Sequence, residues 1–162
     1  MITLYCPACY AANPENAAVC QKCGANLREA PRGNWTERLI WGLQHPEPTV
    51  APRVAWILGE RRDAAAVRPL LALIERTREL GALEEAATAL GKIGDPAAVP
   101  ALADLLRTSF VSVRVRAAEA LGAIGGAAAE AALREALADP SAHVREACGA
   151  ALQKLHATRG AA

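Results

Sequence analysis

Four of the five cysteines in this 162-residue chain stand as two Cys-x-x-Cys pairs close to its start. Cys6 and Cys9 form the first pair, ten residues intervene, and Cys20 and Cys23 form the second. A Cys-x-x-Cys turn directs both sulfurs to the same side, so two such turns can present four thiolates to one tetrahedral zinc ion. The spacing therefore predicts one structural Zn²⁺ held by these four cysteines. Four thiolates leave no open coordination position, which argues against a catalytic zinc.

The residues around the cysteines support their interpretation as ligands. Pro7 stiffens the first turn, and Gly24, directly after Cys23, permits the positive φ that such a turn requires. A segment of about thirty residues buries too little apolar surface to fold without a metal. The alternative is a pair of redox-active or accidental Cys-x-x-Cys motifs, which the doubled spacing disfavours.

The stretch YCPACYAANPENAAVCQKCGANL resembles the short prokaryotic zinc-ribbon family. The pattern of that family is CPxCG, a proline-containing hairpin loop, and CxxCG followed by an apolar residue. Asn13-Pro14 marks the loop and Leu27 takes the last place, whereas Tyr10 stands where the family has a glycine in the first turn. The resemblance implies a zinc ribbon over residues 1–30.

The rest of the chain is organised by an internal repeat. Leu-Gly pairs recur at Leu58, Leu90 and Leu121, and Leu152 continues the series, at separations of 32, 31 and 31 residues. A period near 31 residues indicates a helical solenoid, in which each repeat contributes a pair of helices. Around each leucine, apolar residues follow at spacings of three and four, which is the pattern of the buried face of a helix.

The repeat and the turn signals define the expected organisation of the chain. We predict a mainly α protein, an alpha-alpha superhelix preceded by the small ribbon. Residues 31–48 form a linker and a capping helix, the latter from about Trp35 to Gln44. Three helical hairpins and a final helix then occupy residues 49–157, and residues 158–162 form a frayed tail.

Two segments, EAATALGKIGDPAAVPALADLL and DPSAHVREACGAAL, resemble the HEAT-like repeats first associated with phycobiliprotein lyases. Their pattern is DPxxxVRxxAxxALGxIGDPxAVPxLxxLL, and the resemblance covers about Val50 to Leu155. Asp95 and Asp139 are then helix N-caps, each followed by a proline at the first helical position. The resemblance implies the solenoid fold, but such repeats occur in many proteins without lyase activity.

The other residues with a potential for chemistry form no recognisable catalytic set. Some HEAT proteins are metal-dependent hydroxylases whose helices present His-Glu pairs to two irons, but neither His45, His143 nor His156 is followed by glutamate. Cys148 aligns with alanines of the earlier repeats and has no activating base nearby in the sequence. We therefore predict that the chain is not an enzyme, with lyase-like activity left open by the resemblance.

Three residues are candidates for contact with a partner. Trp56 falls in the outward column of the first helices, where a large aromatic needs either a cover or a partner. We expect the helix over residues 35–44 or the ribbon to cover it, and the alternative is a binding anchor. Arg114 and Arg145 hold matching places in consecutive helices. They either contact an acidic partner or, as we expect, pair with carboxylates within the solenoid.

Composition limits the class of partner and the compartment. The chain has 18 basic and 17 acidic residues, a balance that predicts neither nucleic acid nor an anionic membrane as partner. No apolar run reaches the ~18 to 20 residues of a membrane span. The start MITLYCPAC lacks the features of a secretion signal, which favours the cytoplasm, and the abundant alanine and arginine suggest a prokaryote.

These observations together predict a non-catalytic protein–protein interaction, scaffold or adaptor module that binds another protein and no small-molecule substrate. Two alternatives stay open at this point. The first is a bilin-lyase-like subunit, although known lyase subunits of this type are longer and work in pairs. The second is nucleic-acid binding through the ribbon, which the balanced charge does not favour.

Overall fold

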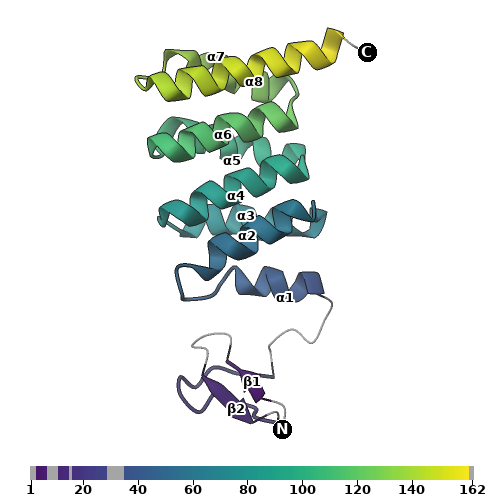
Figure 1. Cartoon of the computed structure of the whole chain (residues 1–162), viewed down its shortest axis with the longest axis vertical. Helices are drawn as coiled ribbons and strands as arrows, with labels where there is room; N and C mark the ends of the chain where they lie inside the picture. Colours follow the sequence, from purple (N-terminus) through teal and green to yellow (C-terminus); the bar gives the residue numbers. More distant parts are fainter. Residues whose placement is uncertain (1–2, 7–10, 15, 29–34, 161–162) are drawn as a thin grey trace.

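The structure, a computed structural model, describes residues 3–6, 11–14, 16–28 and 35–160. Pro7, Cys9, Tyr10 and the expected N-cap Asn34 lie outside the described residues, as does most of the predicted linker. The α-helices, the short 3-10 helices (η) and the strands are arranged as in Figure 1. In chain order they are β1 (Thr3–Tyr5), β2 (Ala12–Pro14), α1 (Trp35–Gly42), α2 (Val50–Glu60), η1 (Ala64–Ala66), α3 (Val67–Arg76), α4 (Leu80–Ile93), η2 (Pro96–Ala98), α5 (Val99–Thr108), α6 (Val111–Ile124), α7 (Ala127–Glu135), η3 (Ala136–Ala138) and α8 (Ala142–Gly160).

Acidic side chains cap helices at Asp95, as predicted, and at two positions that were not predicted. Asp95 accepts a hydrogen bond from the amide of Ala97 at the start of η2, so this predicted cap is confirmed. Asp139 accepts a hydrogen bond from the amide of Ser141 at 2.8 Å, but α8 begins only at Ala142, so Asp139 lies in the turn before the helix and its predicted role as N-cap is wrong. Asp63 caps η1, and Glu79 caps α4 through the amides of two successive residues. Each cap satisfies amides that the first helical turn leaves without a partner.

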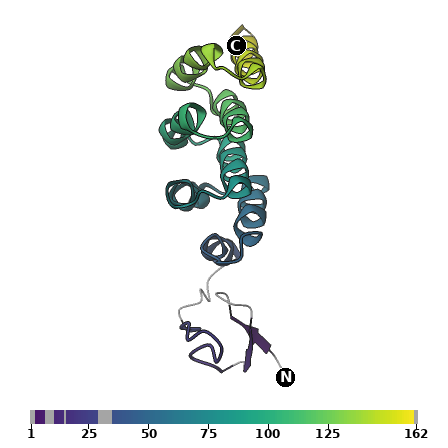
Figure 2. The same cartoon turned by 90° about the vertical axis from the view of Figure 1, so that its left-hand side faces the viewer.

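The helices form two layers, as the predicted solenoid requires (Figure 2). The first layer consists of α2, α4, α6 and α8, which pack directly on one another in sequence. The second layer consists of α3, α5 and α7, each lying against helices of the first layer. One continuous apolar core, made mostly of leucine and alanine, runs between the layers. The mainly α solenoid predicted from the repeat is therefore confirmed.

Glycines of the Leu-Gly pairs set the spacing of the first layer. A Cβ atom on Gly59 would lie 2.7 Å from the Cα of Ala89, and one on Gly122 would lie 2.6 Å from the Cβ of Ala151. Atoms at such distances overlap, so only glycine allows the neighbouring helix to approach this closely. The repeated glycine is therefore a packing requirement between successive repeats.

Helix α1 covers the N-terminal end of this stack. Leu43, just after α1, is 2% exposed within the solenoid core, and Leu39 packs against the same core. Thr36 donates a hydrogen bond to the carboxylate of Asp63 at 2.6 Å, and Arg76 donates to the carbonyl of Leu43 at 2.6 Å. These contacts attach α1 to the first repeat.

At the other end of the stack, α8 continues to Gly160 and so includes part of the tail that was predicted to fray. Helix α8 lies at the top of Figure 1, and its C-terminal end reaches past the end of α6. Among the described residues, no helix is both long and apolar enough to cross a membrane.

The N-terminal segment has its own small core. Strands β1 and β2 are antiparallel, with Leu4 opposite Asn13. Leu27, 5% exposed, packs with Cys6 and Cys20. Gly24 has φ +74°, so the positive φ expected after the second cysteine pair is confirmed.

Candidate functional site

Three cysteines converge in the N-terminal segment. The sulfurs of Cys6, Cys20 and Cys23 all lie within 4.8 Å of one another, and those of Cys6 and Cys23 are 3.6 Å apart. A disulfide needs about 2 Å, whereas four thiolates on a tetrahedral zinc at 2.3 Å lie about 3.8 Å apart. The described sulfurs therefore fit a metal ion, and the fourth predicted ligand, Cys9, lies outside the described residues.

A buried asparagine organises the second cysteine pair. The side chain of Asn13, 3% exposed, accepts a hydrogen bond from the amide of Gln21 at 2.9 Å and donates to the carbonyl of Ala11 at 2.7 Å. The same amide group lies 3.7 Å from the sulfur of Cys20, and the backbone amide of Lys22 lies 3.4 Å from that sulfur. Such N–H donors stabilise a thiolate and orient it toward a metal.

Trp56 lies open on the face of the first layer. It is 52% exposed, so neither α1 nor the described part of the ribbon covers it, and the expected intramolecular cover is wrong. The reason is geometric, because α1 packs against the end of the stack through Leu39 and Leu43 and leaves the outward face of α2 free. Trp56 therefore remains as a candidate anchor for a partner.

A groove of about 510 Å³, which we call the cationic groove, lies on the helices of the first layer. Its charged lining consists of Arg62, Lys92, Arg116 and Glu119. Lys92 of α4 pairs with Glu60 of α2, and Arg116 pairs with Glu119 at 2.9 Å. The hydrogen bond and the charge of Glu119 raise the pKa of Arg116. The groove crosses from the end of α2 over α4 to α6, so three repeats contribute to it.

Arg114 forms its contacts within the solenoid. Its guanidinium pairs with Asp139 at 2.9 Å and donates to the carbonyl of Ser109 at 2.9 Å, and its side chain is 14% exposed. Arg145 donates to the carbonyls of Asp139 at 2.8 Å and Pro140 at 3.0 Å. Both arginines thus hold the loops that precede their own helices, and Arg114 also links two repeats. For Arg114 this is the internal ion pair that we favoured over contact with a partner, whereas Arg145 bonds backbone carbonyls and not a carboxylate.

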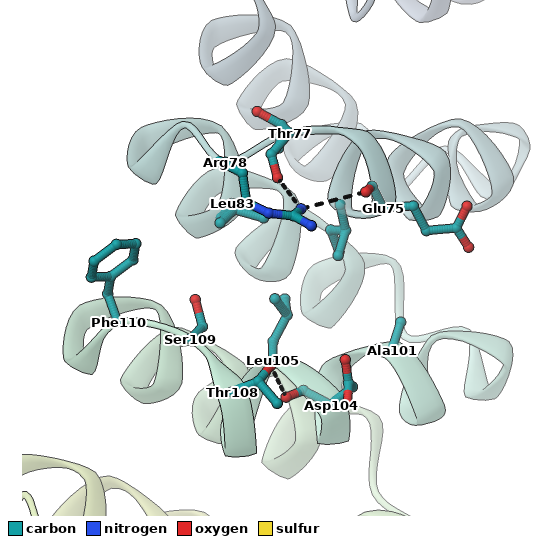
Figure 3. A pocket seen from close by; sticks show the side chains of 11 residues that line it. Glu75, Thr77, Arg78, Leu83, Ala101, Asp104, Leu105, Thr108, Ser109 and Phe110 are labelled. Carbon is teal, nitrogen blue, oxygen red and sulfur yellow. Dashed lines mark hydrogen bonds between the residues drawn. The ribbon is translucent and has the colours of Figure 1, made fainter.

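A larger groove of about 610 Å³, here called the loop groove, lies between α3 and α4 on one side and α5 with the loop that follows it on the other (Figure 3). Phe110 stands at its mouth and is 64% exposed. Glu75 and Asp104 contribute carboxylates, while Arg78 donates to the carbonyl of Thr77 at 2.8 Å. The charges of the loop groove are therefore mixed, and its guanidinium is held by its own loop.

The histidines and the fifth cysteine form no common site. His45 precedes α2, whereas His143 and His156 lie near opposite ends of α8. His156 lies 3.0 Å from the buried carboxylate of Glu130. In the part of the chain that the structure describes, the cluster of three possible metal ligands is made of cysteines alone. Cys148 is fully buried in the core, and burial raises the pKa of its thiol to about 11.

The repeats, their glycine contacts and their caps define the class of protein. The family model for HEAT repeats matches residues 36–114 and 105–162, and the chain belongs to this family. No curated protein matches the chain.

Two solved structures are similar to it. Human deoxyhypusine hydroxylase is 31% identical, with a TM-score of 0.67, over 78% of this chain and 45% of the hydroxylase. The complex of CpcE and CpcF of phycocyanin lyase from Nostoc sp. PCC7120 contains a chain that is 30% identical, with a TM-score of 0.66. That match covers 83% of this chain and 60% of the lyase chain. The chain thus spans about half the length of the proteins it matches.

These similarities correct one prediction. The chain was expected not to be an enzyme, but the similar structures are an enzyme and a lyase complex, so that expectation is contradicted. The expectation was based on the sequence of this chain, which shows no recognisable set of catalytic residues. Repeats of this kind are also found in a hydroxylase and in a lyase made of two proteins, so that lack does not exclude a role in catalysis.

Three residues of these surfaces were not found from the sequence alone. Asn13 was interpreted only as part of a loop, and its buried amide is visible only once β2 is placed beside the cysteines. Phe110 does not belong to the periodic pattern of apolar residues in the repeats. Arg62 could have been found, because in the repeat register it stands where the next repeats have Gly94 and Gly125.

Proposed function

We propose that this chain is a protein-binding HEAT scaffold that holds its partner on the face of the first layer around Trp56. The observation that carries the proposal is a tryptophan, 52% exposed, on helices that are fixed by direct packing. Tryptophan is enriched among the residues that contribute most to binding energy at interfaces. A rigid stack presents such an anchor with little loss of conformational entropy on binding.

The N-terminal segment has a structural role in this proposal. Cys6, Cys20 and Cys23, together with Cys9, hold one Zn²⁺ in a reducing, cytoplasmic setting. When bound, the ion supplies on the order of 10 kcal/mol of folding free energy to a segment with a very small core. The amide of Asn13 and the backbone amide of Lys22 orient the sulfur of Cys20 toward it.

Partner capture from an extract of the source organism tests the proposal, with Trp56→Ala as the variant and Phe110→Ala as a matched control. Both aromatics are largely exposed, and they lie on different surfaces. We expect Trp56→Ala to lose the partner while its unfolding free energy stays within about 0.5 kcal/mol of the parent. Loss of the partner in Phe110→Ala alone would instead assign binding to the loop groove.

A second candidate function is that of a bilin-lyase-like subunit acting with another protein. The similarity to a chain of the phycocyanin lyase complex, over 83% of this chain, favours it. Co-expression with a second lyase subunit, the phycocyanin subunits and free bilin tests this function. Covalent chromophore on phycocyanin that appears only when this chain is present would support it, and equal labelling without the chain would exclude it.

A further inference from the structure

The turn after α2 contains a residue whose backbone conformation does not suit its side chain. Arg62 has φ +49° and, among the described residues, is the one non-glycine with a positive φ. In the repeat register the same place is taken by Gly94 with φ +80° and by Gly125 with φ +75°. The turn needs this conformation, because the amides of Arg62 and Asp63 bond back to carbonyls near the end of α2.

Glycine adopts this conformation freely, whereas an arginine is strained by its Cβ. The surrounding structure gives no packing reason for a long side chain here, since Arg62 is exposed. No hydrogen bond or ion pair of its guanidinium is found among the described residues. A strained residue with an unengaged charge at the rim of a groove is a feature of binding sites.

The other two cations of the cationic groove are available as well. Lys92 pairs with Glu60, and Arg116 pairs with Glu119, but all four side chains are between 37% and 53% exposed. Exposed ion pairs contribute little, so a carboxylate of a ligand can replace the internal partner at small cost. Arginine is suited to this exchange because its planar guanidinium binds a carboxylate through two parallel hydrogen bonds.

Trp56 lies on the same face as the groove. Thr88, which lines the groove on α4, occupies the place in its repeat that Trp56 has on α2. A segment that lies across α2, α4 and α6 can therefore contact both the exposed indole and the cations of the groove. The apolar part of such a segment packs on the indole ring, and its carboxylates reach Arg62 and the two cations that now pair with Glu60 and Glu119.

We propose that the cationic groove binds an acidic segment of a partner protein, with an apolar residue of that segment on Trp56 and its carboxylates on Arg62, Lys92 and Arg116. The inference rests on the proposed function and adds the chemistry of the partner. A polyphosphate backbone is not favoured as the occupant, because the whole chain has a net charge of only +1.

Binding of fluorescently labelled polyglutamate to the full zinc-loaded chain tests the inference, with polylysine and single-stranded RNA as comparison probes. The decisive variant is Arg62→Gly, which removes the charge and restores the residue that the turn favours. We expect its melting temperature to stay the same or rise while its affinity for polyglutamate falls about tenfold, the loss typical of one charged hydrogen-bonded contact. Arg62→Lys keeps the charge and should retain most of the affinity.

Arg68→Ala is the matched control, because Arg68 is also exposed but lies on α3 in the second layer. It should bind polyglutamate as the parent does. Equal affinity in Arg62→Gly and the parent, or a preference for RNA or polylysine over polyglutamate, would overturn the inference. If Trp56→Ala loses the natural partner while Arg62→Gly keeps it, the scaffold proposal stands and the acidic segment does not.

Discussion

A Cβ atom on Gly91 would lie 2.7 Å from the Cα of Ala120 in the next helix of the first layer. Gly59 and Gly122 approach alanines of the following repeat in the same way, so the contact recurs along the stack. Backbone lies on the other side of each contact, and backbone cannot rotate away as a side chain can. The spacing of α2, α4, α6 and α8 therefore depends on these glycines.

We predict that Gly91→Ala lowers the unfolding free energy by about 1 to 3 kcal/mol, the usual cost of overpacking, even though alanine favours helix. Gly149→Ala is the control, because Gly149 lies in α8 with nothing within 4 Å of a Cβ. That change should stabilise the chain by up to about 1 kcal/mol. Urea denaturation of both variants measures the difference, and equal effects would contradict the packing role of Gly91.

The cysteine cluster predicts one zinc ion per chain. Cys6→Ser should reduce the zinc content of purified protein from one ion to none, because three thiolates leave the site incomplete. Cys148→Ser should leave it unchanged, since Cys148 is buried in the solenoid core. Elemental analysis of both variants gives the answer, and zinc retained in Cys6→Ser would contradict the assignment of ligands.

Chelation should unfold the N-terminal segment and leave the solenoid folded. The small core around Leu27 and the large core of the repeats are separate apolar clusters. A metal holds the first, and helix packing holds the second. Far-ultraviolet circular dichroism before and after a strong chelator measures this, and loss of most of the helical signal would mean that the two parts unfold as one unit.

The ion pair between Arg114 and Asp139 should make the folded chain less stable at acid pH. Burial by itself would raise the pKa of Asp139, but the Ser141 amide and the Arg114 guanidinium outweigh it and lower that pKa. A carboxyl with a lowered folded-state pKa stabilises the fold above its unfolded pKa, and this contribution disappears as the pH falls through the folded value.

Asp139→Asn should therefore lower the melting temperature at neutral pH, and the difference from the parent should shrink as the solution is acidified. The loss of charged hydrogen bonds is typically worth about 1.5 to 3 kcal/mol. Asp104→Asn serves as the control, because Asp104 forms only an exposed pair with Arg107 at 3.5 Å. A difference in melting temperature between Asp139→Asn and the parent that stays constant from neutral to acid pH would contradict the role of this carboxylate.

Cys148 should resist alkylation in the folded chain. Burial raises the pKa of its thiol to about 11, so the reactive thiolate is scarce at pH 8 and is shielded by the core. Because the folded-state pKa is the higher one, the unfolding free energy should also fall as the pH rises from about 9 to about 11. Iodoacetamide labelling of zinc-loaded protein, followed by mass spectrometry, should find Cys148 modified only after denaturant is added. Rapid labelling of Cys148 in the native chain would contradict its burial.

The sequence by itself determined the repeat, because its signals are local and periodic. The spacing of Leu58, Leu90 and Leu121 requires a buried stripe at the same place in each repeat, and Asp95 with its following proline specifies where a helix begins. These features act over a few residues, so they predict the solenoid and the cap at Asp95 without knowledge of distant contacts.

Only the tertiary structure decided which surfaces are free. The exposure of Trp56 depends on where α1 packs, and α1 packs on the end of the stack, a relation between segments that no local pattern encodes. The pairing of Arg114 with Asp139 joins residues 25 positions apart, and the cationic groove joins three repeats. Such surfaces arise from how whole helices pack, because burial and charge pairing depend on neighbours that are distant along the chain.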